Sequence, residues 1–153
     1  MKRFAFGICV LFVLALIGHN VHARTNDELS VLNRQIECVS MFSTLKIYEN
    51  IQEQNEVDGK TIEEMYEKKN IRFSSLNLHI RAMVMDVQKA KEDLNDFEAD
   101  VQKIMNDGAV DSDEVLKKSV QSLLARTHAL KERVIAHEKF TKEFVKRVLL
   151  DQS

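Results

Sequence analysis

Apolar residues recur at alternating spacings of four and three along the second half of this chain, and this repeat constrains the fold more than any other feature. The first run consists of Leu76, Ile80, Met83, Val87, Ala90, Leu94, Phe97, Val101 and Ile104. The second run consists of Leu116, Val120, Leu123, Thr127, Leu130, Val134, His137, Thr141, Phe144 and Val148. A sustained repeat of this kind keeps one stripe of a helix against a partner helix. Because the linker over 107–111 is short, the two runs predict an antiparallel helical hairpin.

Two glycines divide residues 24–153 into three segments, and each segment has its own helix-start pattern. A capping box, Ser/Thr-x-x-Glu, begins at Thr25 and again at Thr61, directly after Gly59. After Gly108, a polar residue at 111–112 can cap the last helix. We therefore predict three helices, with a turn around each glycine. Their predicted bounds are about 26–55, 62–106 and 112–150.

These helices predict an all-α fold, an elongated antiparallel three-helix bundle in a single domain of residues 24–153. The middle helix would be roughly 68 Å long at 1.5 Å per residue. A break within Asn70–Ser75 would give four helices instead. The apolar repeat continues backwards from Phe73 through Lys69 to Ile62, and this favours one continuous middle helix. The chain has no proline, which is typical of helices rather than of a sheet with many turns.

The first 23 residues have the pattern of a secretory signal peptide. Two basic residues, Lys2 and Arg3, precede an apolar run over 4–18, and the small-residue close at 21–23 fits a signal-peptidase site. The apolar run is shorter than the roughly 20 residues that span a bilayer. We therefore expect residues 1–23 to be removed, and the remaining chain to be secreted and extracellular without a transmembrane segment.

Cys38 is the one cysteine of the expected mature chain, because Cys9 lies in the leader. One interpretation is a small buried hydrophobe. The other is an intermolecular disulfide that joins two chains into a homodimer, as an odd cysteine in a secreted protein suggests. Acidic residues slightly outnumber basic ones, 24 to 22, and this argues against nucleic acid as a partner.

The residue pattern favours neither catalysis nor metal binding. His79, His128 and His137 lie at least nine positions apart, whereas helical zinc sites use much closer spacings. The sequences around the two glycines lack the ligands of a calcium loop. Nucleophile elbows and phosphate-binding loops are also missing from the sequence. We therefore predict a non-enzymatic protein with no catalytic residues, no metal and no cofactor.

An interaction surface is predicted near the carboxyl end. Phe140 and Val145 lie beside the apolar repeat rather than in it. A basic face accompanies them, made of Lys139, Lys142, Lys146 and Arg147. Such a face can steer protein association, and a solvated helix face is the plainer interpretation. The apolar arc over 29–51 is wider than one helix contact requires, so that segment either lies in a groove between two helices or shares its apolar surface with another molecule.

A leader followed by a proline-free, charge-rich helical body of this size resembles the small salivary proteins of blood-feeding flies. Among these it is most similar to the mosquito family that contains anophensin and albicin, which block the alternative complement pathway or the plasma contact pathway. The resemblance covers residues 24–153 in size and helical pattern, together with the leader run from Phe4 to Ala23. It implies a secreted inhibitor of host complement or haemostasis.

Two functions follow as expectations. The first is a secreted binding protein that occupies a surface of an extracellular protein, in plasma or in the immune system of a host. The alternative is a secreted lipid carrier, because proline-free amphipathic helices also resemble apolipophorin-like bundles that open onto lipid. The narrow stripes of the predicted hairpin suit fixed helix packing better than a wide lipid-facing surface.

Overall fold

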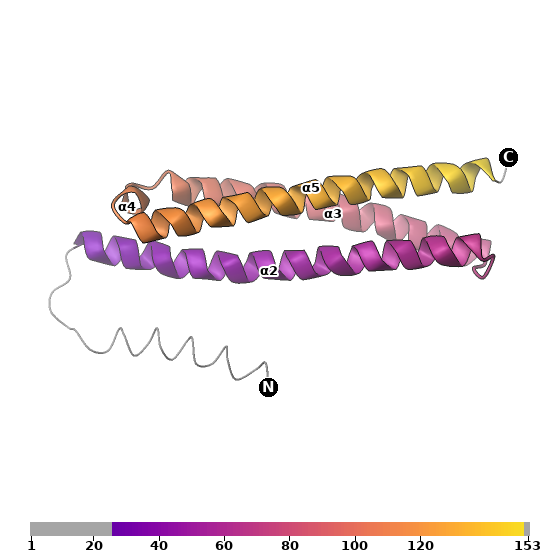
Figure 1. Cartoon of the computed structure of the whole chain (residues 1–153), viewed down its shortest axis with the longest axis horizontal. Coiled ribbons are helices and arrows are strands. Elements are labelled where there is room, and N and C mark those ends of the chain that lie inside the picture. Colours follow the sequence, from indigo (N-terminus) through magenta and orange to yellow (C-terminus); the bar gives the residue numbers. More distant parts are fainter. Residues whose placement is uncertain (1–25, 152–153) are drawn as a thin grey trace, which may run out of the picture.

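The computed structural model describes residues 26–151, and its long helices lie side by side as an elongated bundle (Figure 1). Its helices, in chain order, are α2 (Asn26–Glu67), α3 (Phe73–Met105), α4 (Gly108–Asp111) and α5 (Glu114–Leu150). Among these residues there is no strand. The predicted all-α class and the bundle of three long helices are therefore confirmed. The predicted leader and the first capping-box residue, Thr25, lie outside the described residues.

The predicted hairpin is present, since α3 and α5 pack along each other in opposite directions and α2 packs against both (Figure 1). All ten positions of the second apolar repeat, from Leu116 to Val148, are buried on α5. Seven positions of the first repeat are buried on α3, and its other two, Ile80 and Ala90, are half-buried. The repeat thus marks the packed side of each helix.

The predicted turn at Gly59 is wrong, because α2 continues through this residue to Glu67. Gly59 is buried, and a Cβ atom there would lie 3.1 Å from Cε1 of Phe140 and 3.2 Å from Nε2 of His137. Glycine therefore serves close packing of α5 on α2 rather than a change of direction. Thr61, predicted to cap a helix, lies inside α2, and its hydroxyl donates to the backbone carbonyl of Val57.

The chain reverses instead over 68–72, and it does so without glycine. Lys69 adopts a left-handed conformation with φ of 54°, and the Asn70 N–H donates to the Met65 carbonyl at 2.9 Å. This hydrogen bond closes the end of α2 in the way of a left-handed helix cap. The favoured continuous middle helix is therefore wrong, and the alternative, a break near Asn70, is present. Three long helices remain because the predicted break at Gly59 is absent.

Side-chain caps organise the opposite end of the bundle. The Asp107 carboxylate accepts from the Ala109 N–H at the start of α4. The Asp113 carboxylate accepts from the N–H groups of Val115 and Leu116 at the start of α5. The last long helix therefore starts slightly later than predicted, with Asp113 as its cap. Arg34 of α2 donates to Asp107 at 2.6 and 3.0 Å and fastens α2 to this end.

Two apolar clusters make up the core. The Leu45 cluster, toward α4, contains Cys38, Leu45, Leu94, Phe97, Val101, Ile104, Val110, Leu116, Val120, Leu123, Leu130 and Val134. The Phe144 cluster, toward the carboxyl end, contains Ile62, Leu76, Met83, Phe144 and Val148. Along α5, the buried polar residues His137 and Thr141 lie between the two clusters.

A polar layer of Gln52, His137 and Thr141 therefore separates the clusters. Gln52 Nε2 donates to Glu56 Oε1 at 3.0 Å and lies 3.3 Å from His137 Nδ1. This arrangement makes Nδ1 an acceptor and assigns the proton of the neutral ring to Nε2. His137 Nε2, Gln52 Oε1 and Thr141 Oγ1 have no hydrogen-bond partner within the described part of the chain. Burial lowers the pKa of His137, against the opposing effect of Glu56 and Asp86.

Candidate interaction surface

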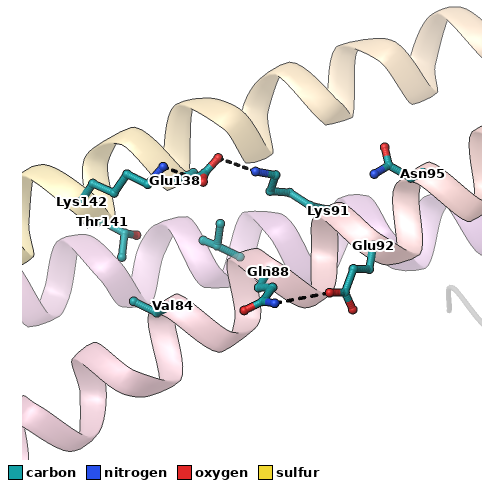
Figure 2. A pocket seen from close by; sticks show the side chains of 9 residues that line it. Val84, Gln88, Lys91, Glu92, Asn95, Glu138, Thr141 and Lys142 are labelled. Carbon is teal, nitrogen blue, oxygen red and sulfur yellow. Dashed lines mark hydrogen bonds and ion pairs between the residues drawn. The ribbon is translucent and has the colours of Figure 1, made fainter.

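A groove of about 410 Å³ lies between α3 and α5, on the side of the hairpin shown in Figure 2. Val84 and Val87 of α3 and Thr141 of α5 line its apolar part. Lys91 and Lys142 approach one carboxylate, Glu138, from the two helices. The groove therefore combines apolar lining with an organised charged rim.

With its outer edge included, the rim contains more lysines than glutamates: Lys91, Lys139, Lys142 and Lys146 against Glu92 and Glu138. Glu138 accepts hydrogen bonds from the ammonium groups of Lys91 and Lys142, each at 2.8 Å. Hydrogen bonds from Lys142 and Lys91 lower the pKa of Glu138 to about 2, so this carboxylate stays ionised at neutral pH. Two cations share one anion, so the cluster carries a net positive charge with its lysines held in place.

The apolar lining continues from the groove toward the carboxyl end of α5. Val145 and Leu149 follow Thr141 at steps of four residues, which places them on one side of α5. Phe73 precedes Val84 on α3 by about three helical turns. Leu149 is 63% exposed, Phe73 55% and Val84 46%. We call the groove and this strip the α3/α5 face, formed by Phe73, Val84, Lys91, Glu138, Lys142, Val145 and Leu149.

The structure separates the six predicted interaction residues. Lys142 and Val145 belong to the α3/α5 face, and the exposed Lys139 and Lys146 lie at its outer edge, since helical spacing places them beside Lys142. The other two, Phe140 and Arg147, do not belong to this face, because they lie on a different side of α5.

Phe140 and Arg147 face α2. The Phe140 ring is half-buried and stacks on the Phe144 ring with centroids 6.3 Å apart. The Arg147 guanidinium donates to the carboxylates of Glu63 and Glu67 on α2, and its carbon lies 5.5 Å above the Phe144 ring. Both side chains therefore support the Phe144 cluster rather than an exposed patch.

Sequence reasoning missed five residues of the face: Phe73, Val84, Lys91, Glu138 and Leu149. Val84 and Leu149 each follow a residue of the apolar repeat directly, and an apolar residue just outside a packed stripe is the pattern that marks an exposed apolar edge. Lys91 can be assigned to the face only because α5 places Glu138 beside it. The spacing of residues within α3 gives no sign of that contact.

A second exposed apolar surface runs along the first half of α2. Ile36 is 49% exposed, Val39 65% and Ile47 57%, although Leu45 of the same helix is fully buried. We call this surface the α2 stripe, formed by Leu29, Leu32, Ile36, Val39 and Ile47. The wide apolar arc predicted over 29–51 therefore has two sides, one packed on the bundle and one exposed.

Cys38 lies on the packed side. It is 3% exposed and belongs to the Leu45 cluster, and burial raises the pKa of its thiol. A disulfide to a second chain would require the bundle to open around it. The small buried hydrophobe is the interpretation that this position fits.

Two of the three histidines named in the sequence analysis lie in one groove, and no metal-binding cluster accompanies them among the described residues. His79 and His137 line one groove between α2 and α3, but His137 Nε2 lies against Gly59. The described chain contains no cluster of three or more His, Cys, Asp or Glu side chains placed to hold a metal ion. Among the helices of residues 26–151, none combines the length and apolar character needed to cross a membrane.

Comparison of the chain with family models, curated proteins and solved structures found no match. The class of protein therefore follows from the geometry, which defines an all-α bundle with an exposed apolar surface on each of two sides. Those two surfaces are the features of the described residues that bear on function.

Proposed function

We propose that this chain is a secreted, non-enzymatic protein that binds an extracellular protein through the α3/α5 face. The single observation that carries the proposal is the union, on one face, of exposed apolar side chains with lysines held in place by Glu138. Specific protein interfaces combine an apolar centre with a polar rim in the same way. Ordered cations lose less conformational freedom on binding than free lysine side chains do.

The charge of the rim specifies the kind of partner. Lys91, Lys142 and Lys146 favour an acidic border around the partner's apolar residues, because complementary charge steers association. Acidic residues outnumber basic ones over the whole chain, so the group of lysines at this rim departs from the average charge of the chain. An acidic segment with one or two large apolar side chains suits it best.

The proposed targets are plasma proteins of the complement or contact pathway. The resemblance to small salivary proteins of blood-feeding flies supports this choice, together with the predicted leader. The protein would act by covering a surface that the target needs for its next assembly step. No catalytic group is required for such an effect.

The test begins with the full chain, expressed with its own leader in secreting animal cells and recovered from the medium. Alternative-pathway complement lysis and contact-activated clotting are then measured with the recovered protein. We expect inhibition of one pathway. A double variant, Val84→Asp with Leu149→Asp, places charge in the apolar strip and should weaken inhibition at least about tenfold, the usual cost of losing central apolar contacts.

Leu78→Asp with Met85→Asp provides the matched control. Both side chains are 69% exposed and lie on α3 outside the α3/α5 face, so inhibition should persist. Equal inhibition by the two double variants would reject the face as the binding site. The function would be rejected by two results together. The wild-type chain would inhibit neither pathway, and it would retain no plasma protein that the Val84 and Leu149 double variant fails to retain.

A lipid carrier is the second candidate, and the polar layer favours it. Three buried polar atoms of this layer lack a hydrogen-bond partner among residues 26–151. Such atoms reduce the free energy that holds the two clusters together, so the bundle has a place to open. Because residues 26–151 are already almost entirely helical, opening would add little helix. Flotation with phosphatidylcholine vesicles is therefore a better measurement than circular dichroism, and flotation without inhibition would favour the carrier.

A further inference from the structure

We propose that a second copy of this chain docks on the α2 stripe, so that two bundles associate through an antiparallel pair of α2 helices. The stripe and the α3/α5 face lie on different helices, and the proposal is independent of the proposed target. It names the occupant of an apolar surface that the folded chain leaves uncovered.

The spacing of the stripe is that of a helix-packing surface. Leu29, Leu32, Ile36 and Val39 alternate steps of three and four, and Ser43 and Ile47 follow at steps of four. The same repeat packs α3 on α5 inside the bundle. A stripe from residue 29 to residue 47 extends roughly 27 Å along the helix. A helix of similar spacing is the shape that covers such a stripe best.

The charges around the stripe favour an identical partner. Arg34 is directed to α4 by its hydrogen bonds to Asp107, and it also pairs with Glu37. The residues that border the middle of the stripe, Ser40 and Ser43, are small and uncharged. Interfaces between identical subunits are similarly apolar and poor in charge. A strongly charged partner would find few opposite charges here, whereas a second α2 stripe matches the composition.

An antiparallel register satisfies both the apolar and the charged positions. With the twofold axis midway between Ile36 and Val39, Ile36 of one copy lies opposite Val39 of the other, and Leu32 lies opposite Ser43. The same register brings Lys46, which lies 3.5 Å from Glu49 of its own helix, close to Glu28 of the other copy at both ends of the contact. In a parallel pair, Lys46 of one copy would instead lie level with Lys46 of the other copy, and the two helix dipoles would point in the same direction.

The contact is small, because one helix side on each copy forms it. Interfaces at the low end of the size range bind weakly, and we expect a dissociation constant on the order of 10 μM. The dimer would leave the α3/α5 face of each copy uncovered. Two copies of that face would then bind a multivalent target more tightly than one, a consequence that rests on the proposed function.

Sedimentation velocity of the full-chain product, over a concentration series that spans the expected dissociation constant, tests the association. We expect the mass to rise from one chain to two, with and without reductant, since the contact involves no disulfide. The double variant Ile36→Glu with Val39→Glu should remain a single chain throughout. Its circular dichroism should match the wild type, because both side chains are about half exposed or more.

Leu78→Asp with Met85→Asp again serves as the matched control and should still dimerise. A wild-type chain that stays monomeric over the whole series, or a dimer that survives the Ile36 and Val39 changes, would overturn the proposal. Loss of the dimer on reduction would assign the association to Cys38 instead and would also overturn it. Inhibition assays on the same variants separate this result from the proposed function, because the α3/α5 face is unchanged.

A charge exchange tests the register. Lys46→Glu places two acidic residues close together at each end of the antiparallel contact and should weaken the dimer several-fold. Lys46→Glu combined with Glu28→Lys reverses both charges and should restore it. A failure of the second change to restore association would reject the antiparallel register.

Discussion

The Leu45 cluster and the Phe144 cluster are built on the same helical repeat, yet they hold the bundle together differently. The Leu45 cluster contains twelve buried residues, most of them aliphatic, whereas the Phe144 cluster contains five. Two side-chain caps, Asp107 and Asp113, close the end beside the Leu45 cluster. At the other end, α3 begins at Phe73, and its N-cap residue, Arg72, forms no side-chain cap.

Aromatic contacts compensate for the smaller number of buried residues in the Phe144 cluster. The Tyr66 ring meets the Phe144 ring edge-on with centroids 5.7 Å apart, and the Phe140 ring stacks on it from another side. Arg147 adds a cation above the same ring. One side chain therefore organises this half, while the other half distributes its packing over many. Regular spacing sets which side of a helix is buried, and residue size decides how the buried side is stabilised.

Substitution of Phe144 is the strongest way to break this comparison. Phe144→Ala should lower the free energy of unfolding by about 4 kcal/mol, because it removes a buried ring and leaves a cavity. Urea denaturation followed by circular dichroism measures the change. Val115→Ala, at a position 72% exposed, should change stability by less than about 0.5 kcal/mol. A Phe144 effect as small as that of Val115 would show that the cluster does not depend on the ring.

The two glycines sharpen the comparison, because the same change can be made beside the polar layer and at the α4 end of the bundle. Gly59→Ala should destabilise the protein by about 1 kcal/mol. The added Cβ atom would lie closer to Phe140 and buried His137 than ordinary van der Waals contact, and this crowding outweighs the gain in helix propensity. Gly108→Ala meets no atom within 4 Å and should stabilise by about 0.5 kcal/mol. Thermal or urea unfolding checks both. Equal effects of the two substitutions would contradict the packing role of Gly59.

Helix caps give a comparable effect of opposite sign at the two ends. Asp113→Ala removes the cap of α5 and should cost about 1 kcal/mol. Arg72→Asp supplies the missing cap of α3 and replaces a cation at the positive end of the helix dipole, so it should add up to about 1 kcal/mol. Denaturation midpoints measure the two changes. Destabilisation by Arg72→Asp would show that this end already satisfies its amides in another way.

The polar layer predicts the smallest effect, a pH dependence of stability. Burial lowers the pKa of His137 below its ordinary 6.5, so the unfolded chain binds a proton before the folded chain does. The free energy of unfolding should therefore fall as pH drops below about 6.5, and the loss should continue down to the lowered pKa. Unfolding of the wild type and of His137→Met at several pH values above pH 5 measures this slope.

His137→Met should flatten the slope, because methionine fills similar space and does not titrate. His79→Gln, at an exposed position, should leave the slope unchanged. An identical pH dependence in the wild type and in His137→Met would assign the loss to the carboxylates instead.

Sequence alone was sufficient for the all-α class and for the buried sides of α3 and α5. Spacing depends on helix geometry, which is local, so Leu116 through Val148 could be placed in the core without a structure. The hairpin followed because a short linker permits only an antiparallel return. The carboxyl-terminal half of the candidate surface was accessible for the same reason, since Lys142 and Val145 lie where their spacing predicts.

Tertiary structure decided the turn and most of the site. Gly59 carries the usual sign of a turn, but its lack of a side chain admits Phe140 and His137, and the true reversal uses Lys69 in a conformation that glycine more often adopts. Lys91 and Glu138 are distant in sequence and meet only because α3 and α5 pack together. Local spacing is written in the order of residues, whereas close approach between helices depends on the sizes of side chains that meet from different parts of the chain.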